Sequence, residues 1–561
     1  MTALDLAEAA SLPETPNLDG AYPRLGQAQL DTLQPYGQRR PIQGGEVLFV
    51  EGDPSESLYI ILAGRVAMVE GYGTDEQRVV RVHGPGRFLG ELSLLTGQTD
   101  FYTAVALDNG EVLVVPVEGL RAVVSENPAL GDDILRACLI RRTMAIGLGV
   151  GFRILGSCYS QDTRRLRDFA MRNRLPHRFL DLENDPTAEN LLRQFGLEPD
   201  ETPVVVWRDR VLRNPSNAEL AQLVGLTTVA GGESACDLLV VGAGPAGLAA
   251  AVYGASEGLT TIVVDAVAIG GQAATSSRIE NYLGFPAGIS GGELADRAAI
   301  QARRFGARTS VPATAQQLTR DDGHYRIRFA DGTEVFARTV VLATGARYRK
   351  LPVPRLEEFE ETSIYYAATP IEAQLCVNDP VVVVGGGNSA GQATIFLADH
   401  VGKIHLVVRE HQLDEYMSRY LADRIERDPR INVLLHTEIR ELLGDKSLRA
   451  VLVQDNESGQ ERTLEARELF VFIGATPCTD WLADTLALGS GGYVLTGADT
   501  ARAANGQFDN LGRAPLMLET TEPGVFAVGD VRSGSIKRVA SAVGEGAMAV
   551  RLVHEHLATH R

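Results

Sequence analysis

Short apolar runs separated by glycine-containing turns fill the first part of the chain, from residue 22 to about residue 147. Typical examples are residues 45–53 and 58–66, in which apolar stretches are bounded by glycine. Strands at this close spacing predict a small antiparallel barrel or jelly roll. A helix is predicted to follow the strands over residues 127–146.

The second part, about residues 150–228, alternates strands with helices. The predicted helices cover residues 162–174 and 188–195. The predicted strands cover residues 153–156, 179–182 and 202–207. This β-α-β-α-β order predicts a compact α/β domain.

A linker rich in Gly, Thr and Ser, residues 227–235, leads into the third part, where strands and helices alternate as far as residue 561. This alternation favours parallel sheets covered by helices. The longest apolar runs, such as residues 380–384, are predicted to be buried strands. They fall far short of the roughly 20 apolar residues that span a bilayer.

A glycine motif follows the first strand of the third part, residues 237–241. It reads Gly242-Ala243-Gly244-Pro245-Ala246-Gly247 and opens an Ala-rich helix. The first glycine permits a tight turn, the second lets the backbone approach a pyrophosphate, and the third lets the helix pack on the strand. The next strand ends in Asp265, 23 residues after Gly242, close to the roughly 20 expected for an acid that binds a ribose hydroxyl. These residues predict a dinucleotide site.

The motif recurs after the strand 381–384 as Gly385-Gly386-Gly387-Asn388-Ser389-Ala390. The following strand, residues 404–408, ends in Arg409 and not in an acid. A guanidinium suits the 2′-phosphate of NADPH, whereas an acid would favour NADH, so NADPH is favoured over NADH. Glu410 beside it weakens this preference. Two unlike sites indicate two Rossmann-like domains, one for a tightly held FAD and one for an exchangeable nicotinamide cofactor.

Composition and charge exclude several other classes. With 53 Lys and Arg against 72 Asp and Glu, the formal net charge of −19 argues against nucleic acid or an anionic membrane as a partner. The N-terminus lacks a basic region followed by an apolar run, so we expect a cytoplasmic protein without a signal peptide. The five cysteines show no C-x-x-C spacing, so we expect neither a disulfide framework nor a metal site.

Residues 234–561 resemble bacterial thioredoxin reductase over essentially the full length of that family. The resemblance adds FAD-domain segments beyond the glycine motifs: Gly270-Gly271-Gln272, Glu280-Asn281, Ala343-Thr344-Gly345, Gly529-Asp530 and Lys537-Arg538-Val539. It implies that Asp530 accepts a hydrogen bond from the flavin ribityl chain. It also implies that the helix start beside Lys537 stabilises the reduced flavin. An NAD(P) domain at 353–480, inserted into an FAD domain at 229–352 and 481–561, and a homodimer follow from the same resemblance.

The redox C-x-x-C of that family is absent. Ala367 and Pro370 occupy the positions of its two cysteines, and neither side chain can form a thiolate or a disulfide. Cys376 is nearby, but a lone thiol cannot cycle as an intramolecular disulfide, and we expect it to be a small buried hydrophobe. Reduction of thioredoxin through the usual pair is therefore excluded.

Residues 150–228 resemble thioredoxin or glutaredoxin. Thr202-Pro203 is similar to the cis-proline turn that precedes a strand in those folds. The loop 156–162 contains a single cysteine, Cys158, near the expected start of a helix, where its pKa could be lowered. Cys158 is therefore a possible redox thiol, but a redox-inactive docking module is the favoured interpretation.

Residues 22–149, behind a tail at 1–21, resemble a cyclic nucleotide-binding domain. Residues 88–95 match the phosphate cassette of that family and imply that Gly90 and Glu91 face the ligand, with Glu91 on the ribose hydroxyl. Asp100 stands where the family has an arginine, and a carboxylate repels a phosphate. A barrel that has lost cyclic nucleotide binding, or that binds another ligand, is favoured over a working receptor.

Together these patterns predict an FAD-dependent NAD(P)H oxidoreductase with two N-terminal accessory domains. Hydride transfer requires no acid, base or nucleophile from the protein, so no catalytic residue is assigned. The electron acceptor stays open between oxygen, a quinone, a flavoprotein and ferredoxin. One alternative is a disulfide or thioredoxin reductase that uses another thiol, and a second is a non-catalytic redox or nucleotide sensor.

Overall fold

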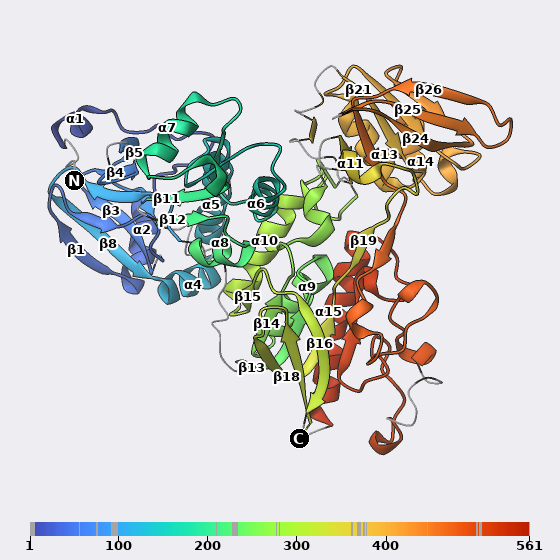
Figure 1. Ribbon diagram of the computed structural model, residues 1–561. Helices are drawn as coiled ribbons and strands as arrows, with labels where there is room; N and C mark the ends of the chain where they lie inside the picture. The colour runs from blue at the N-terminus through green and yellow to red at the C-terminus, as the bar shows by residue number, and fades with distance from the viewer. Residues whose placement is uncertain are drawn as a thin grey trace. The chain divides into compact units, whose positions relative to one another are not determined.

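The computed structural model describes all but a few short stretches of the chain (Figure 1). The chain forms two compact units, one of Met1–Ser234, Val264–Ile269 and Ala299–Thr314 and the other of Ala235–Val263, Gly270–Ala298 and Ala315–Arg561. None of the described helices is long and apolar enough to cross a membrane. The described residues are 6–54, 56–74, 77–90, 99–208, 210–226, 234–276, 278–279, 281–321, 323–360, 363–366, 368, 372–373, 376, 379–445, 447–500, 503 and 508–559.

Two antiparallel four-stranded sheets near the N-terminus confirm the predicted barrel or jelly roll. Their strand orders are β1-β8-β3-β6 and β2-β7-β4-β5. Leu58 and Ile60 alternate along β3 and are fully buried, as expected for a strand with one face on the core. The strands are β1 Gln38–Ile42, β2 Val47–Phe49, β3 Ser57–Ala63, β4 Val66–Glu70, β5 Arg78–His83, β6 Phe88–Leu89, β7 Thr103–Ala106 and β8 Gly110–Pro116.

The helix predicted over residues 127–146 is α5, Pro128–Gly147. Pro128 begins it because a proline in the first turn removes no helical hydrogen bond. The other helices of this part are α1 Leu6–Ser11, α2 Gln27–Leu33 and α4 Val117–Glu126.

The second part has the predicted β-α-β-α-β order and adds one strand and one helix. Its sheet order is β10-β9-β11-β12, with β9 parallel to β10 and antiparallel to β11. This is the topology of the thioredoxin fold, and the Thr202–Pro203 peptide is cis. The elements are β9 Phe152–Gly156, α6 Gln161–Arg172, β10 His177–Asp181, α7 Pro186–Gln194, β11 Val204–Trp207, β12 Arg210–Arg213 and α8 Asn217–Leu223.

The barrel and the thioredoxin-like part share one hydrophobic core. Phe101 of the barrel stacks on Trp207 of β11, with ring centroids 5.6 Å apart and an interplanar angle of 18°. Phe101 and Trp207 belong to the same buried cluster as Phe152 and Phe169. The two parts are therefore packed together as one unit.

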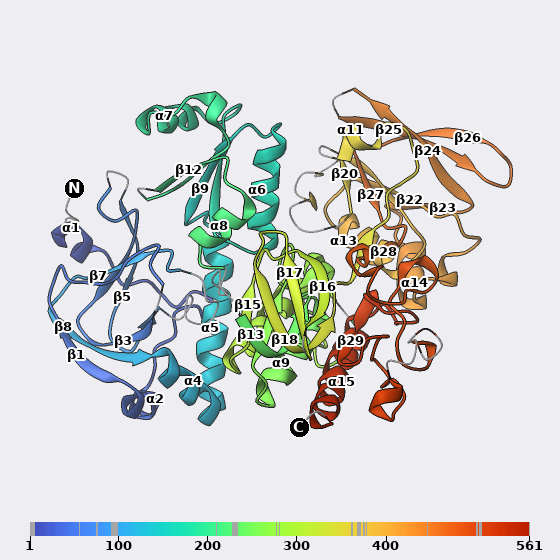
Figure 2. The same cartoon turned by 60° about the horizontal axis from the view of Figure 1, so that its bottom comes forward.

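The third part of the chain contains a seven-stranded sheet in the order β15-β14-β13-β18-β17-β16, with β29 paired in parallel to β18. Helices α9 and α15 pack side by side and also contact β18 (Figure 2). They approach closely because Gly546 has no side chain: a Cβ there would lie 2.1 Å from the carbonyl oxygen of Ala246. The elements are β13 Ser234–Val241, α9 Pro245–Ser256, β14 Thr261–Val264, α10 Gly291–Arg304, β15 Arg308–Ser310, β16 Ala315–Asp321, β17 His324–Phe329, β18 Glu334–Leu342, β29 Val525–Ala527 and α15 Val539–Ala558.

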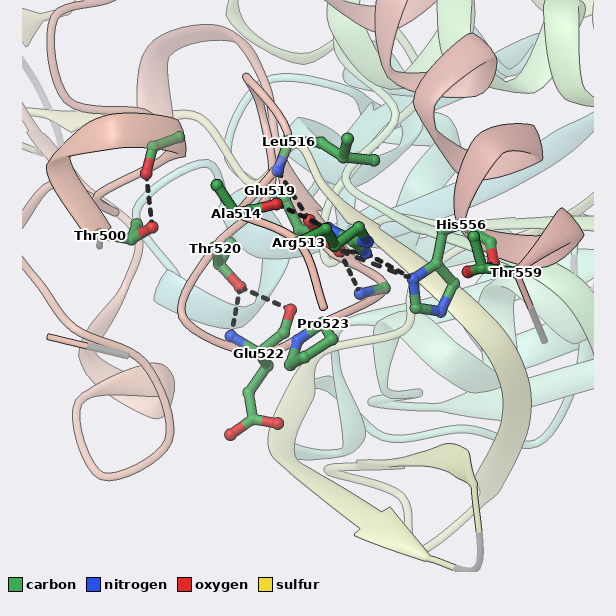
Figure 3. Close-up of polar contacts among 12 residues, drawn as sticks. Thr500, Arg513, Ala514, Leu516, Glu519, Thr520, Glu522, Pro523, His556 and Thr559 are labelled. Carbon is green, nitrogen blue, oxygen red and sulfur yellow. Dashed lines mark hydrogen bonds and ion pairs between the residues drawn. The ribbon is translucent and has the colours of Figure 1, made fainter. Parts of the chain in front are cut away.

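A buried ion pair fixes the segment before β29 against α15 (Figure 3). Both oxygens of the Glu519 carboxylate accept from Arg513, at 2.6 and 2.9 Å, and the Glu519 side chain is fully buried. The backbone N–H groups of Leu516 and Gly524 also donate to this carboxylate, each at 2.8 Å. His556 of α15 lies beside the pair, with its Nδ1 3.6 Å from Glu519 Oε1.

The third part also contains a parallel five-stranded sheet in the order β20-β27-β21-β22-β23. Val381 and Val383 of β21 belong to a core cluster with residues of the helices α13 and α14. Val382 and Val384 belong to a cluster with residues of the antiparallel strands β24, β25 and β26. The valine run is therefore covered on both faces, as parallel sheets require. The elements are α11 Leu356–Glu360, β20 Ile364–Tyr365, β21 Pro380–Val384, α13 Asn388–Ala398, β22 Lys403–Val407, α14 Arg419–Arg427, β23 Ile431–Leu434, β24 Thr437–Gly444, β25 Leu448–Asp455, β26 Glu461–Glu465 and β27 Glu468–Val471.

Candidate dinucleotide sites

The first glycine loop connects β13 to α9 as predicted. Gly242 has φ +108°, and a Cβ there would lie 2.2 Å from the carbonyl oxygen of Ala343. A Cβ at Gly247 would lie 1.8 Å from the carbonyl oxygen of Gly242. Gly244 differs, because the nearest atom to its Cβ position is Gly271 Cα at 4.0 Å. Two of the glycines are thus required by packing, and Gly244 leaves open space in front of the helix.

Helix α9 begins at Pro245, and its N-cap residue is Gly244. Within the described part of the chain, no side chain caps this helix. The N–H groups of its first turn therefore suit a negatively charged group, as the pyrophosphate of FAD requires.

The structure brings several of the predicted FAD segments to this loop. Gly271 approaches Gly244, since a Cβ at Gly271 would lie 2.9 Å from Gly244 Cα. The side chain of Gln272 donates to the carbonyl oxygen of Ala346. Thr344 donates to the carbonyl oxygen of Cys478 at 3.0 Å, next to Gly345, whose φ is +67°.

Three further residues of the predicted FAD site are Glu280, Asn281 and Asp265. Asn281 is exposed, and Glu280 lies outside the described residues. Asp265 follows β14, and its Oδ1 accepts from the N–H groups of Val267 and Ala268 at 2.8 and 3.0 Å. These bonds hold its carboxylate at the end of the strand.

Asp530 provides the strongest test of whether the residues fit FAD. It lies in a short turn, Gly529–Val531, directly after β29. Burial raises its pKa, Lys537 opposes that rise, and Glu545 adds to it. Among the described residues, none forms a hydrogen bond or ion pair with the Asp530 carboxylate. A half-buried acceptor of this kind fits a ribityl hydroxyl, as the resemblance implies.

Lys537, Arg538 and Val539 stand at the start of α15, as predicted. Val539 is its first residue and Arg538 its N-cap residue. Lys537 donates to the hydroxyl of Tyr493 at 2.8 Å. The two cations and the helix start together favour negative charge at this place.

The second glycine loop connects β21 to α13. Gly385 has φ +140°, and a Cβ there would lie 2.3 Å from the carbonyl oxygen of Phe472. A Cβ at Gly387 would meet no atom within 4 Å. Gly387 is the N-cap residue of α13 and receives no side-chain cap from the described residues. This open helix start repeats the arrangement at Gly244 and fits a second dinucleotide.

The three residues after Gly387, Asn388 to Ala390, lie in different surroundings. The Asn388 side chain accepts from the backbone N–H of Ser418 at 2.7 Å, which ties the loop to the segment before α14. Ser389 is exposed, and Ala390 is fully buried in the core beneath the helix. Asn388 therefore shapes the loop.

Arg409 and Glu410 follow β22 but lie in very different surroundings. The side chain of Arg409 is 73% exposed and that of Glu410 only 13%. Arg409 Nε donates to Glu410 Oε1 at 2.8 Å. Glu410 Oε2 is buried and accepts no hydrogen bond from the described residues. It lies 2.5 Å from where a Cβ of Gly386 would be, so the carboxylate reaches the glycine loop.

Sequence reasoning missed Glu410 and Gly386 as site residues. Glu410 entered the sequence analysis only as an acidic neighbour of Arg409 that weakens the preference for NADPH, and Gly386 had no role assigned. The glycine motif does not specify a glycine at position 386. A side chain there would collide with the Glu410 carboxylate in its present position.

Cys376 has the environment of a structural thiol. It is fully buried and donates through Sγ to the carbonyl oxygen of Glu372 at 2.9 Å. Burial, followed by the nearby Glu468, raises the pKa of this thiol well above its ordinary value. The expected small buried hydrophobe is confirmed, while Ala367 and Pro370 lie outside the described residues.

Cys158 stands before α6, as the thioredoxin likeness implied. Its backbone N–H donates to Asp181 Oδ1 at 3.1 Å. Partial burial, and then the carboxylates of Asp181 and Glu183, raise the pKa of the thiol. This surrounding opposes thiolate formation and does not favour the reactive-thiol interpretation.

A pocket between the barrel strands and α5 is lined in part by Arg81, Gly90, Asp100 and Arg141. Asp100 is only 6% exposed and lines this pocket. Glu91 lies outside the described residues, and its predicted contact with a ribose stays a prediction.

His411, His436 and Glu457 bring three possible metal ligands within 4.8 Å of one another. The side chains of His411 and Glu457 are 77% and 64% exposed, and the shortest separations have the length of ordinary ion pairs, 3.6 and 3.4 Å. We assign no metal to this exposed group.

Comparison with known proteins identifies two families in this chain. The pyridine nucleotide-disulphide oxidoreductase family matches residues 236–546, and the cyclic nucleotide-binding domain family matches residues 39–127. The thioredoxin reductase of Treponema pallidum is 32% identical over 327 residues, which are 58% of this chain and 99% of that protein. A 34.2 kDa protein in a rubredoxin operon of Clostridium pasteurianum is 31% identical over 326 residues, 58% of this chain and 98% of that protein.

Among solved structures, thioredoxin reductase of Lactococcus lactis superposes with a TM-score of 0.52 at 25% identity, covering 58% of this chain and 99% of that one. FAD and NADPH, which the sequence led us to expect, are the cofactors of the thioredoxin reductase-like relatives. The chain belongs to the pyridine nucleotide-disulphide oxidoreductase family, as an FAD-dependent oxidoreductase of thioredoxin reductase type with an additional cyclic nucleotide-binding domain.

Proposed function

We propose that this chain oxidises NAD(P)H and reduces an acceptor outside itself, without using a dithiol of its own. The acceptor is a quinone, oxygen, a flavoprotein or ferredoxin. The observation that carries the proposal is the loss of both cysteines at the family's redox position. Alanine and proline replace the cysteine pair, and nearby Cys376 is buried, hydrogen-bonded and held as a neutral thiol.

All five cysteines are among the described residues, and each is a free thiol. No two of them stand in C-x-x-C spacing. The chain therefore offers no ready disulfide to relay electrons to thioredoxin.

The residues of this chain have binding and orienting roles. The open helix starts at Gly244 and Gly387 would each hold a pyrophosphate, and Asp530 would accept from the ribityl chain. Bound FAD would supply hydride-accepting chemistry. Lys537 and the start of α15 would favour negative charge beside it.

Turnover assays of the FAD-containing protein test this proposal. We expect NADPH oxidation with ferricyanide or a soluble quinone, and negligible reduction of a disulfide dye when thioredoxin is added. Rapid dye reduction that depends on thioredoxin would overturn the proposal.

A second candidate function is disulfide reduction through Cys158. One observation favours it: the thioredoxin topology places Cys158 three residues before α6, and a Cβ at Gly156, the last residue of β9, would lie 3.2 Å from Pro203 Cβ. The raised pKa of Cys158 stands against it. Dye reduction that persists in wild type and disappears in Cys158→Ser would establish this candidate.

Assembly and location also remain predictions. A homodimer through residues 234–561 predicts twice the monomer mass in sedimentation equilibrium, and a monomer would contradict it. The expected cytoplasmic location is tested by cell fractionation.

A further inference from the structure

The side chain of Glu410, shortly after the end of β22, lies against the second glycine loop. Its Oε2 reaches the backbone of Gly386, inside the glycine loop that ends at the open helix start of Gly387. In dinucleotide-binding folds of this kind, the residue at the end of the second strand faces the adenosine ribose. Glu410, one residue past Arg409, is the side chain that turns inward here.

Only one of the two carboxylate oxygens of Glu410 accepts a hydrogen bond from the described residues. Oε1 accepts from Arg409, whereas Oε2 is buried and accepts nothing from the described residues. A buried carboxylate oxygen without a donor is costly, and a hydroxyl supplied by a ligand would satisfy it. A ribose carries two such hydroxyls on adjacent carbons.

The same carboxylate disfavours a 2′-phosphate. A phosphate placed against Oε2 would bring two negative charges together in a partly buried site. Arg409, the residue expected to bind that phosphate, already donates to Glu410, and the Glu410 carboxylate raises the pKa of its guanidinium. A 2′-phosphate would therefore have to compete with the Glu410 carboxylate for the Arg409 guanidinium.

We infer that Glu410 is the residue that determines specificity for the nicotinamide cofactor: it accepts from the adenosine ribose hydroxyls and extends the cofactor range of this chain to NADH. This inference rests on the proposed use of NAD(P)H. Gly386 is part of the arrangement, because only a glycine leaves room for the carboxylate.

Equilibrium binding of two nucleotide fragments tests the inference without catalysis. We would titrate FAD-loaded protein with 5′-ADP and with 2′,5′-ADP by calorimetry. Wild type is expected to bind the two with dissociation constants within about tenfold of each other. In Glu410→Gln, 5′-ADP is expected to bind about tenfold more weakly and 2′,5′-ADP no more weakly, as loss of one charge-assisted hydrogen bond predicts.

Two further variants make the result decisive. Gly386→Ala displaces the carboxylate and should reproduce the Glu410→Gln shift in the ratio of the two dissociation constants. Glu426→Gln, an exposed glutamate of α14, should leave the ratio at the wild-type value.

A ratio that favours 2′,5′-ADP by more than about a hundredfold in wild type, and that neither variant changes, would overturn the inference. Failure of either nucleotide to bind would also overturn it. The external-acceptor proposal fails separately, through thioredoxin-dependent dye reduction, so the two failures are distinguishable.

Discussion

The indole N–H of Trp207 donates to the carboxylate of Glu51 at 2.8 Å, across 156 residues of sequence. Glu51 is 3% exposed and also accepts from the N–H of Gly71 at 3.0 Å. Arg208, next to Trp207, donates to the carbonyl oxygen of Glu51 at 2.7 Å. The barrel and the thioredoxin-like part are thus joined by a buried polar contact as well as by the stacked rings of Phe101 and Trp207.

Trp207→Phe is expected to lower the stability of this unit by about 2 kcal/mol at pH 7, because a buried carboxylate loses a donor while the aromatic stacking stays. Burial raises the pKa of Glu51 above its unfolded value, so the folded state binds this proton more tightly. That stabilisation is present at low pH and is lost as the pH rises through the folded pKa. The cost of Trp207→Phe should therefore shrink as the pH falls.

Urea unfolding followed by circular dichroism at two pH values measures this cost. The same substitution in a Glu51→Gln background should cost less, because no charge is then left without its donor. An equal cost in both backgrounds and at both pH values would show that the contact with Glu51 is unimportant.

The Arg513–Glu519 pair predicts sensitivity to acid. Burial alone would raise the pKa of Glu519, but Arg513, His556 and two backbone N–H groups lower it from 4.5 to about 2. A lowered folded pKa gives stability that is present above the unfolded pKa and is lost as the pH falls toward 2. The stabilisation is about 3 kcal/mol at neutral pH.

Thermal unfolding of wild type and Glu519→Gln should therefore differ at neutral pH and converge in acid. Arg513→Met leaves the carboxylate buried without its cation and should cost about 3–5 kcal/mol at pH 7. A gap between wild type and Glu519→Gln that does not change with pH would contradict this account.

Gly244→Ala and Gly247→Ala form a matched pair at the FAD loop. Gly244 has an extended backbone with φ −71°, and its Cβ position has no neighbour closer than 4.0 Å, so Gly244→Ala should fold normally. It should nevertheless weaken FAD retention, because the methyl group would occupy the approach of the pyrophosphate.

Gly247→Ala should instead destabilise the fold, since its Cβ would lie 1.8 Å from a carbonyl oxygen. Flavin absorbance after gel filtration and thermal unfolding separate the two effects. Full retention of FAD by Gly244→Ala would show that the pyrophosphate does not lie there.

Cys158 is expected to react slowly with iodoacetamide at pH 7, because burial and Asp181 keep its thiol protonated. Asp181→Asn removes the second cause and should raise the alkylation rate several-fold. Mass spectrometry assigns the label, with Cys478 as an internal reference. Rapid alkylation of wild-type Cys158 would support the disulfide-reductase alternative.

Periodicity and glycine spacing were enough to predict most elements and both loops. The valine run 381–384 predicts a buried strand. The motif alone places Gly242 and Gly385 in loops that each join a strand to the following helix. The motif does not reveal which glycines serve packing and which leave space, because that depends on distant carbonyls such as those of Ala343 and Phe472.

The inward turn of Glu410 was beyond sequence reasoning for a related reason. Arg409 and Glu410 are adjacent, and nothing in their order tells which one faces the glycine loop once the strand has ended. The contact of Trp207 with Glu51 is equally invisible, since no periodic pattern links residues so far apart in the chain.

Anaerobic reductive titration of the FAD-containing protein tests the central claim most directly. A reductase of this type with a redox disulfide takes up hydride equivalents for both the disulfide and FAD. This chain is predicted to take up one equivalent of NADPH per FAD, with loss of the flavin absorbance and no new reactive thiols. Uptake of a second equivalent together with two new thiols, or no loss of absorbance with either NADPH or NADH, would contradict the account.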